Sequence, residues 1–305
     1  MGKSTELILK AMGGSFVYRA YPQSLYRESE VQDLFEVAHR EVKRIEEKFT
    51  EFHDSVITRI NTDAGIKSSS LDDELLYLLQ CSRSYYEKSE GLFDPTYASY
   101  LSRWRKGKIG FFEKHRLRAL VNFKKVKIDE EKKTIFLPYK DQRIGLGGIG
   151  KGYAVDRAFE FLRGKGLVNF SVNGSGDMRV HSTEDAPRPW KIGIRNPFSK
   201  ETNRSAGLVQ IQNGSVSTSG SYIQNKGNSS DHHIIHHYED EERHPVSCTV
   251  VGESCMDTDV WATIAMTQDI GKAMKLLNSE GIYAILIDKQ GRSHLSKKAL
   301  ENFGR

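Results

Sequence analysis

The sequence is poor in cysteine and has no long apolar run. Its three cysteines, Cys81, Cys248 and Cys255, form no Cys-x-x-Cys pair and leave one over in any disulfide scheme. Reduced thiols in a reducing compartment fit this pattern best. No stretch is long and apolar enough to cross a bilayer, and the first residues lack the apolar segment of a signal peptide. We therefore expect a soluble, cytoplasmic protein without a membrane segment, although a trimmed chain would look the same.

Linker-like segments are absent as well. No proline-rich, serine-rich or low-complexity stretch interrupts the 305 residues, and we find no internal repeat. A chain of this length can form one large domain or two, and without a linker we expect a single domain over residues 1–305. The net charge of +5 comes from 45 basic and 40 acidic residues that are spread along the chain. This mixed surface implies no nucleic-acid partner.

Hydrophobic periodicity predicts an α+β fold. Apolar residues at three- and four-residue steps predict a long helix over residues 31–49 and a second helix that runs from about residue 71 to near Gly91. Shorter apolar runs predict two strands within 125–144 and further strands over 15–21, 167–172, 190–194, 207–212, 215–219, 246–251 and 282–288. Helices are predicted over 154–162, 256–267 and 272–277. This irregular alternation favours a mixed-sheet core with peripheral helices over a doubly wound sheet.

The most informative stretch is a glycine-dense turn that leads into an amphipathic helix, residues 144–163. Gly145, Gly147 and Gly150 have the spacing of a dinucleotide-binding fingerprint. The acidic residue expected about 20 positions on is not there, since Asp177 lies further downstream, and over 140 residues precede a motif that usually opens its domain. The same turn followed by Lys151 matches a P-loop up to its last position, where a glycine replaces the hydroxyl residue that binds magnesium. A third interpretation is a glycine turn required only for close packing.

Asp94 lies in a second turn of interest, the segment Gly91-Leu-Phe-Asp-Pro-Thr96. A residue before proline is disfavoured in helical geometry. We therefore expect Asp94 in a rigid extended turn, with its carboxylate free to bond either the backbone or a ligand.

A carboxylate and a hydroxyl are expected on one face of the helix over 256–267. Asp259 and Thr263 are four residues apart, hence one helical turn. Together they offer two hard oxygen ligands of the kind that magnesium takes beside substrate phosphates. The alternative is ordinary capping of the helix by Asp257 or Thr258, with Asp259 bonding first-turn amides.

Histidines concentrate in one segment, residues 231–244, which holds five of the ten in the chain. A zinc site with Cys248 and Cys255 is one interpretation, although the spacing does not favour it. An exposed polar loop and a single functional histidine are the others. His233 is the best candidate for such a histidine, because the apolar Ile234 and Ile235 follow it and favour partial burial.

In this order, these segments resemble the ApbE family, the magnesium-dependent FAD:protein FMN transferases. The family hallmark Asp-Leu-Gly-Gly-Ile-Ala-Lys-Gly-Tyr-Ala-Val-Asp resembles residues Gly145 to Asp156. The other family marks resemble Met12 to Gly14, Ser55 to Asn61, Gly91 to Thr96, Thr218 to Tyr222, His233 to His236 and Thr258 to Thr263. Ordered matches over residues 12–267 are far more specific than either glycine pattern alone.

Carried over residue by residue, the resemblance implies an ApbE-like fold and a magnesium site against the pyrophosphate of FAD. Its ligands would be the backbone carbonyl of Gly148 and the side chains of Asp259 and Thr263. Lys151 would add a positive charge, and His233 would be the base that activates a threonine or serine of an acceptor flavoprotein. FMN would move from FAD to that hydroxyl, with release of AMP. The implied flavin-nucleotide pocket is lined by Met12, Phe52, Leu92, Phe93 and Asp94.

Three positions depart from the family pattern. The first hallmark aspartate is Gly145 here, which removes a carboxylate expected to contact FAD. The residues that normally follow the histidine motif are replaced by an acidic run, and Ser221 replaces an aspartate. Besides flavin transfer, these departures leave FAD pyrophosphatase activity and non-catalytic FAD binding open, and a nicotinamide dehydrogenase is a more distant alternative.

Overall fold

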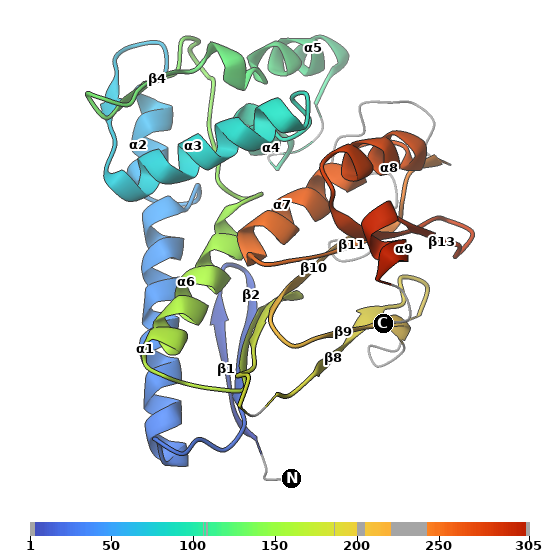
Figure 1. Cartoon of the computed structure of the whole chain (residues 1–305). Coiled ribbons are helices and arrows are strands. Elements are labelled where there is room, and N and C mark those ends of the chain that lie inside the picture. Colours follow the sequence, from blue (N-terminus) through green and yellow to red (C-terminus); the bar gives the residue numbers. More distant parts are fainter. Residues whose placement is uncertain are drawn as a thin grey trace. The chain divides into compact units, whose positions relative to one another are not determined.

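The computed structural model describes residues 4–302 apart from 106, 108, 186, 200–204 and 221–242. The chain forms two compact units (Figure 1). Unit 1 comprises Met1–Arg44 and Lys151–Arg305, and unit 2 comprises Ile45–Gly150. Unit 2 is thus inserted between the two segments of unit 1. The single domain expected over residues 1–305 stays a prediction.

Unit 1 is built on an eight-stranded sheet in the order β1-β2-β6-β7-β10-β11-β12-β13. The described pairings within it are antiparallel, from the β1–β2 hairpin to the β12–β13 hairpin. Its strands are β1 (Thr5–Ala11), β2 (Gly14–Ala20), β6 (Phe170–Gly174), β7 (Asp177–His181), β10 (Gly214–Gly220), β11 (Ser247–Gly252), β12 (Tyr283–Ile287) and β13 (Ser293–Leu295). A separate antiparallel pair consists of β8 (Trp190–Arg195) and β9 (Ser205–Ile211).

Helices pack on this sheet through apolar faces. They are α1 (Glu28–Phe49, which continues into unit 2), α6 (Gly150–Gly164), α7 (Cys255–Met266), α8 (Ile270–Ser279) and α9 (Lys297–Glu301). In α1 the apolar stripe places Phe35 on Tyr18 of β2, with ring centroids 5.6 Å apart. Helix α7 lies against β10 and β11 (Figure 1) and buries ten of its twelve residues, as expected of a helix that is apolar almost all round.

Unit 2 is mostly helical. It contains α2 (Val56–Thr62), α3 (Asp73–Lys88), α4 (Ala98–Trp104), α5 (Phe111–Leu120), the 3-10 turns η1 (Pro95–Tyr97) and η2 (Phe123–Lys125), and the short strands β3 (Ser69–Ser70), β4 (Lys127–Asp129) and β5 (Thr134–Phe136). Leu75, Leu78 and Leu79 of α3 are fully or almost fully buried, together with Ile135 of β5 and Ile144. Ile144, at the start of the glycine turn, is thus a core residue of unit 2.

The predicted α+β class is confirmed, with one correction. The sheet is antiparallel in its described pairings and not mixed, because hairpins and returning connections link neighbouring strands. The strands on either side of the glycine turn do not form a strand-helix-strand unit: β5 belongs to a three-stranded sheet of unit 2, whereas β6 belongs to the large sheet of unit 1. This arrangement rules out the Rossmann interpretation of the glycines.

Sequence periodicity missed β1, α2, β3, α4, α5, β7, β13 and α9. In β1 the side chains alternate between half-buried and exposed, so its apolar pattern is weak. No helix among the described residues is long and apolar enough to span a membrane.

Candidate functional site

The start of α6 packs closely against the start of α7 in unit 1. A Cβ atom on Gly152 would lie 2.5 Å from the carbonyl oxygen of Cys255 and 2.7 Å from the Cα of Met256. Since neither backbone atom can move aside, only glycine fits at this position. The hydroxyl residue of a P-loop is therefore excluded at Gly152, and the close-packing interpretation holds for this glycine.

Asp259 of α7 faces the start of α6. Its Oδ2 accepts a hydrogen bond from the backbone N–H of Gly152 at 3.1 Å and lies 3.5 Å from the Nζ of Lys151. The Lys151 ammonium also contacts the carboxylate of Asp177 on β7. Sequence reasoning weighed Asp177 only as the acidic residue of a dinucleotide site and set it aside.

Two buried carboxylates therefore share one ammonium. Asp177 is 2% exposed and Asp259 is 6% exposed. With Lys151 as their common cation, the cluster keeps one negative charge in excess. Buried charges need compensation, and carboxylate oxygens are ligands that a divalent cation prefers. The Asp259 carboxylate is an oxygen donor of the kind that magnesium takes.

Thr263 completes this face of α7. Its hydroxyl is half-buried, one helical turn from Asp259, and lies 3.3 Å from the Oγ of Ser219 on β10. Among the described residues no group of three or more His, Cys, Asp or Glu side chains could hold a metal. The predicted ligand set has only one such side chain, Asp259, because its other members are a hydroxyl and a backbone carbonyl.

The N-terminus of α7 is capped by residues other than those expected. Ser254 is the N-cap and accepts from the N–H of Asp257, so capping by Asp257 or Thr258 is wrong. Asp156 of α6 accepts from the N–H groups of Cys255 and Met256, each at 2.9 Å. Since these acceptors satisfy the N–H groups at the helix end, Asp259 is not needed for capping and bonds to α6 instead.

The glycine turn and the Gly91–Thr96 segment pack together within unit 2. The N–H of Gly145 donates to the carbonyl oxygen of Pro95 at 3.0 Å. A Cβ on Gly148 would lie 3.0 Å from the Cε2 of Phe93, so the Phe93 ring lies directly on this glycine. The glycine turn, with its predicted magnesium ligand Gly148, and the segment that carries the predicted pocket residue Phe93 are thus neighbours in unit 2.

Asp94 has a structural role in this unit. Its Oδ1 accepts from the N–H of Thr96 at 2.7 Å, and its Oδ2 accepts from the N–H of Phe123 at 3.1 Å. Of the two partners that the sequence left open, backbone or ligand, the structure shows the backbone.

The other predicted pocket residues belong to different units. Phe52 follows α1 in unit 2 and is 77% exposed, and Leu92 is half-buried in the same unit. Met12 is in the β1–β2 turn of unit 1, with a left-handed φ of 50°. His233 and most of the histidine segment fall outside the described residues, so the zinc and polar-loop interpretations stay open.

Comparison with known proteins decides the family. The model of the ApbE family matches residues 12–286. The chain belongs to the ApbE family. Two of the curated relatives are named FAD:protein FMN transferase. That of Klebsiella pneumoniae (strain 342) is 27% identical over 263 residues, which cover 81% of this chain and 80% of the relative. That of Escherichia coli (strain K12) is 23% identical over 254 residues, which cover 79% of this chain and 72% of the relative.

Solved ApbE structures share the fold of this ApbE-family chain. The ApbE protein of Thermotoga maritima MSB8 superposes with a TM-score of 0.83 at 25% identity and covers 99% of this chain and 100% of its own. The flavin transferase ApbE of Vibrio cholerae has a TM-score of 0.82 at 21% identity, with 99% of both chains covered. The ApbE-like fold expected from the sequence is confirmed.

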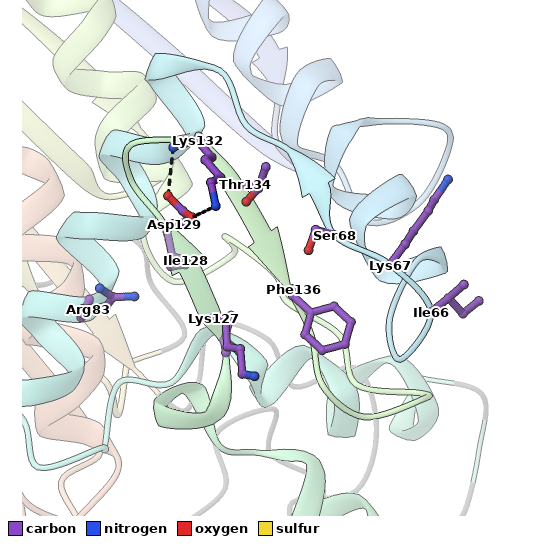
Figure 2. Close-up of a pocket in the computed structure, with 11 residues that line it drawn as sticks. Ile66, Lys67, Ser68, Arg83, Lys127, Ile128, Asp129, Lys132, Thr134 and Phe136 are labelled. Carbon is purple, nitrogen blue, oxygen red and sulfur yellow. Dashed lines mark hydrogen bonds and ion pairs between the residues drawn. The ribbon is translucent and has the colours of Figure 1, made fainter.

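One surface hollow of this ApbE-family protein lies in unit 2. It measures 940 Å³ and is lined by residues of the 66–68, 126–129 and 132–136 segments and by Arg83. Figure 2 shows that its polar side chains include Asp129 and Lys132, which pair with each other. None of the predicted site residues lines it, so we assign it no part in the chemistry.

Proposed function

We propose that this protein is a magnesium-dependent FAD:protein FMN transferase, which moves FMN from FAD to a threonine or serine hydroxyl of an acceptor flavoprotein and releases AMP. Family membership and the names of the curated relatives support the reaction class. The observation that carries the proposal is the buried cluster of Lys151, Asp177 and Asp259, in which an oxygen ligand for a cation lies next to an ammonium that suits a pyrophosphate.

The proposed magnesium ligands are the carbonyl of Gly148, the carboxylate of Asp259 and the hydroxyl of Thr263. All three are hard oxygen donors, which suits this cation. When bound, magnesium would neutralise negative charge on the pyrophosphate as its P–O bond breaks.

The described residues would prepare this site. The N–H of Gly152 fixes the orientation of the Asp259 carboxylate. Lys151 supplies a positive point charge next to it, and Asp177 holds that ammonium from the other side. A preorganised charge of this kind stabilises negative charge that develops on phosphate oxygens, because no reorganisation is needed at the moment of reaction.

His233 is the proposed base. The acceptor hydroxyl would give its proton to the His233 imidazole while its oxygen forms a bond to the FMN phosphorus. The bond between that phosphorus and the bridging oxygen would break, and AMP would leave with the electron pair. This role requires a neutral imidazole near pH 7. From the location that the sequence predicts, we propose a cytoplasmic acceptor.

The test is incubation of the purified protein with FAD, magnesium and a lysate of its source organism. Covalent flavin on a protein band survives denaturation and is visible by its fluorescence, while AMP and FMN are measured by chromatography. AMP together with a flavin-labelled band supports the proposal. AMP with an equal amount of free FMN shows a pyrophosphatase, and intact FAD shows a binding protein; either result overturns the transfer.

A further inference from the structure

Gly145 has no conformational reason to be a glycine. Its φ is not in the left-handed region that favours glycine. Instead, the space where its side chain would lie is occupied. A Cβ at this position would overlap Oε1 of Glu51, lie 2.7 Å from the Cδ of Glu51 and lie 3.0 Å from the Cβ of Ala98.

The position of residue 145 is firmly held. Its own N–H donates to the carbonyl oxygen of Pro95 at 3.0 Å. The preceding residue, Ile144, is bonded through both of its backbone groups to the side chain of Asn61. The direction of any side chain at 145 is therefore set by the backbone, and it points to the Glu51 carboxylate.

The Glu51 carboxylate is held on one oxygen and open on the other. Its Oε2 is 3.3 Å from the Nη1 of Arg105, and the side chain is 16% exposed. Among the described residues no donor bonds Oε1, the oxygen next to Gly145. The Arg105 guanidinium also lies 4.9 Å from the ring of Phe52. Glu51, Arg105 and Phe52 thus form one cluster.

We propose that Glu51 is a FAD-binding residue that supplies the carboxylate missing at position 145. The inference rests on the proposed function, since FAD is the ligand. A carboxylate repels the pyrophosphate, so its partner must be a donor of FAD, a hydroxyl or an N–H group. A charge-assisted hydrogen bond of this kind is stronger than a neutral one. Glu51 is a binding and not a catalytic residue, and it is specific to a chain with glycine at 145.

The experiment moves the carboxylate from one position to the other. FAD affinity is measured by calorimetry for the wild type, Glu51→Ala, Gly145→Asp and the double variant, with FAD confirmed intact by chromatography. We expect Glu51→Ala to weaken binding by about 10- to 100-fold, the loss of one charged hydrogen bond. Gly145→Asp alone should also weaken binding, because two carboxylates cannot share the space. The double variant should recover to within a few-fold of the wild type, a coupling between the two sites.

Asp54→Ala is the matched control, because it removes a carboxylate from the same loop whose side chain is 83% exposed. It should bind FAD as the wild type does, and circular dichroism should show all variants folded. Titrations with FMN and with ADP locate the donor in the flavin or the adenylate half. Wild-type affinity in Glu51→Ala, or a double variant no better than Glu51→Ala, overturns the inference and leaves the proposed function intact. A wild type that binds no FAD overturns both.

Discussion

The side-chain amide of Asn61 replaces a backbone partner for Ile144. Its Nδ2 donates to the carbonyl oxygen of Ile144 at 2.9 Å, and its Oδ1 accepts from the N–H of Ile144 at 2.8 Å. Both residues are buried. The chain is thereby fixed directly before Gly145, so a residue of α2 positions the glycine turn.

Replacing Asn61 by alanine should destabilise unit 2. Two buried backbone groups of Ile144 would lose their partners, at a cost of about 2–5 kcal/mol in the free energy of unfolding. Urea denaturation followed by circular dichroism measures the change. Asn302→Ala is the control, because this exposed amide makes a single bond to Lys298 and its loss should cost under about 1 kcal/mol. Equal effects of the two substitutions would contradict the role of Asn61.

Asp156 should be the main anchor of the α7 N-terminus. It accepts from the N–H groups of Cys255 and Met256 and pairs with Arg179 at 2.8 Å. Asp156→Ala would leave these two donors without a partner and leave Arg179 paired with Glu160 alone, so we expect a loss of about 2–4 kcal/mol. Asp257→Ala, an exposed acid in the same helix turn, should change stability by about 0.5 kcal/mol. Denaturation that shows no difference between them would exclude the anchor.

Thiol reactivity should follow burial. Cys248 and Cys255 are fully buried, and burial raises the pKa of both thiols well above the ordinary value. Cys81 is only half-buried. Since the thiolate is the reactive form, iodoacetamide near pH 8 should label Cys81 alone in the folded protein and all three cysteines after denaturation. Mass spectrometry of the peptides identifies which cysteines are labelled. Rapid labelling of Cys248 in the folded protein would contradict the buried packing of β11.

The turn between β12 and β13 should make stability sensitive to acid. Burial alone would raise the pKa of Asp288, but hydrogen bonds from His294 and Arg292 bring the pKa well below its ordinary value of 3.8. A lowered pKa means that the stabilisation is present above about pH 4 and is lost as the pH falls toward the folded-state pKa.

The variant Asp288→Asn tests this dependence. Its stability deficit relative to the wild type should be constant from pH 7 to about pH 5 and should shrink below about pH 4, as measured by urea denaturation. Asp54→Asn, on an 83% exposed side chain, should show no such trend. A deficit in Asp288→Asn that does not change with pH would show that the carboxylate charge contributes nothing.

The sequence predicts the long elements of the fold well and the roles of single turns poorly. The apolar stripe of α1 and the buried helix α7 are confirmed because their periodicity extends over several turns. Local patterns could not separate the three interpretations of the glycine turn. Only tertiary contacts do, since Gly152 packs on the backbone of α7 and Gly145 makes room for Glu51.

For the candidate site, the order of the motifs along the sequence indicated the family, but the sequence did not show which side chains contact one another. Asp259 and Thr263 lie on one face of α7, as their four-residue spacing predicts. Glu51 and Asn61 gained their significance from residues more than 80 positions away, and Asp177 gained its significance from Lys151 on helix α6. No short window along the chain shows these contacts. The predicted roles of Gly148, Lys151 and His233 stay predictions.

The most direct test of the account is the release of AMP from FAD in the presence of the acceptor-containing lysate, compared with and without magnesium, for the wild type and Asp259→Ala. We predict AMP and a flavin-labelled band only for the wild type with magnesium, and neither for Asp259→Ala or after chelation. Undiminished AMP release by Asp259→Ala, or release that persists in excess chelator, would contradict the proposed magnesium site and the reaction built on it.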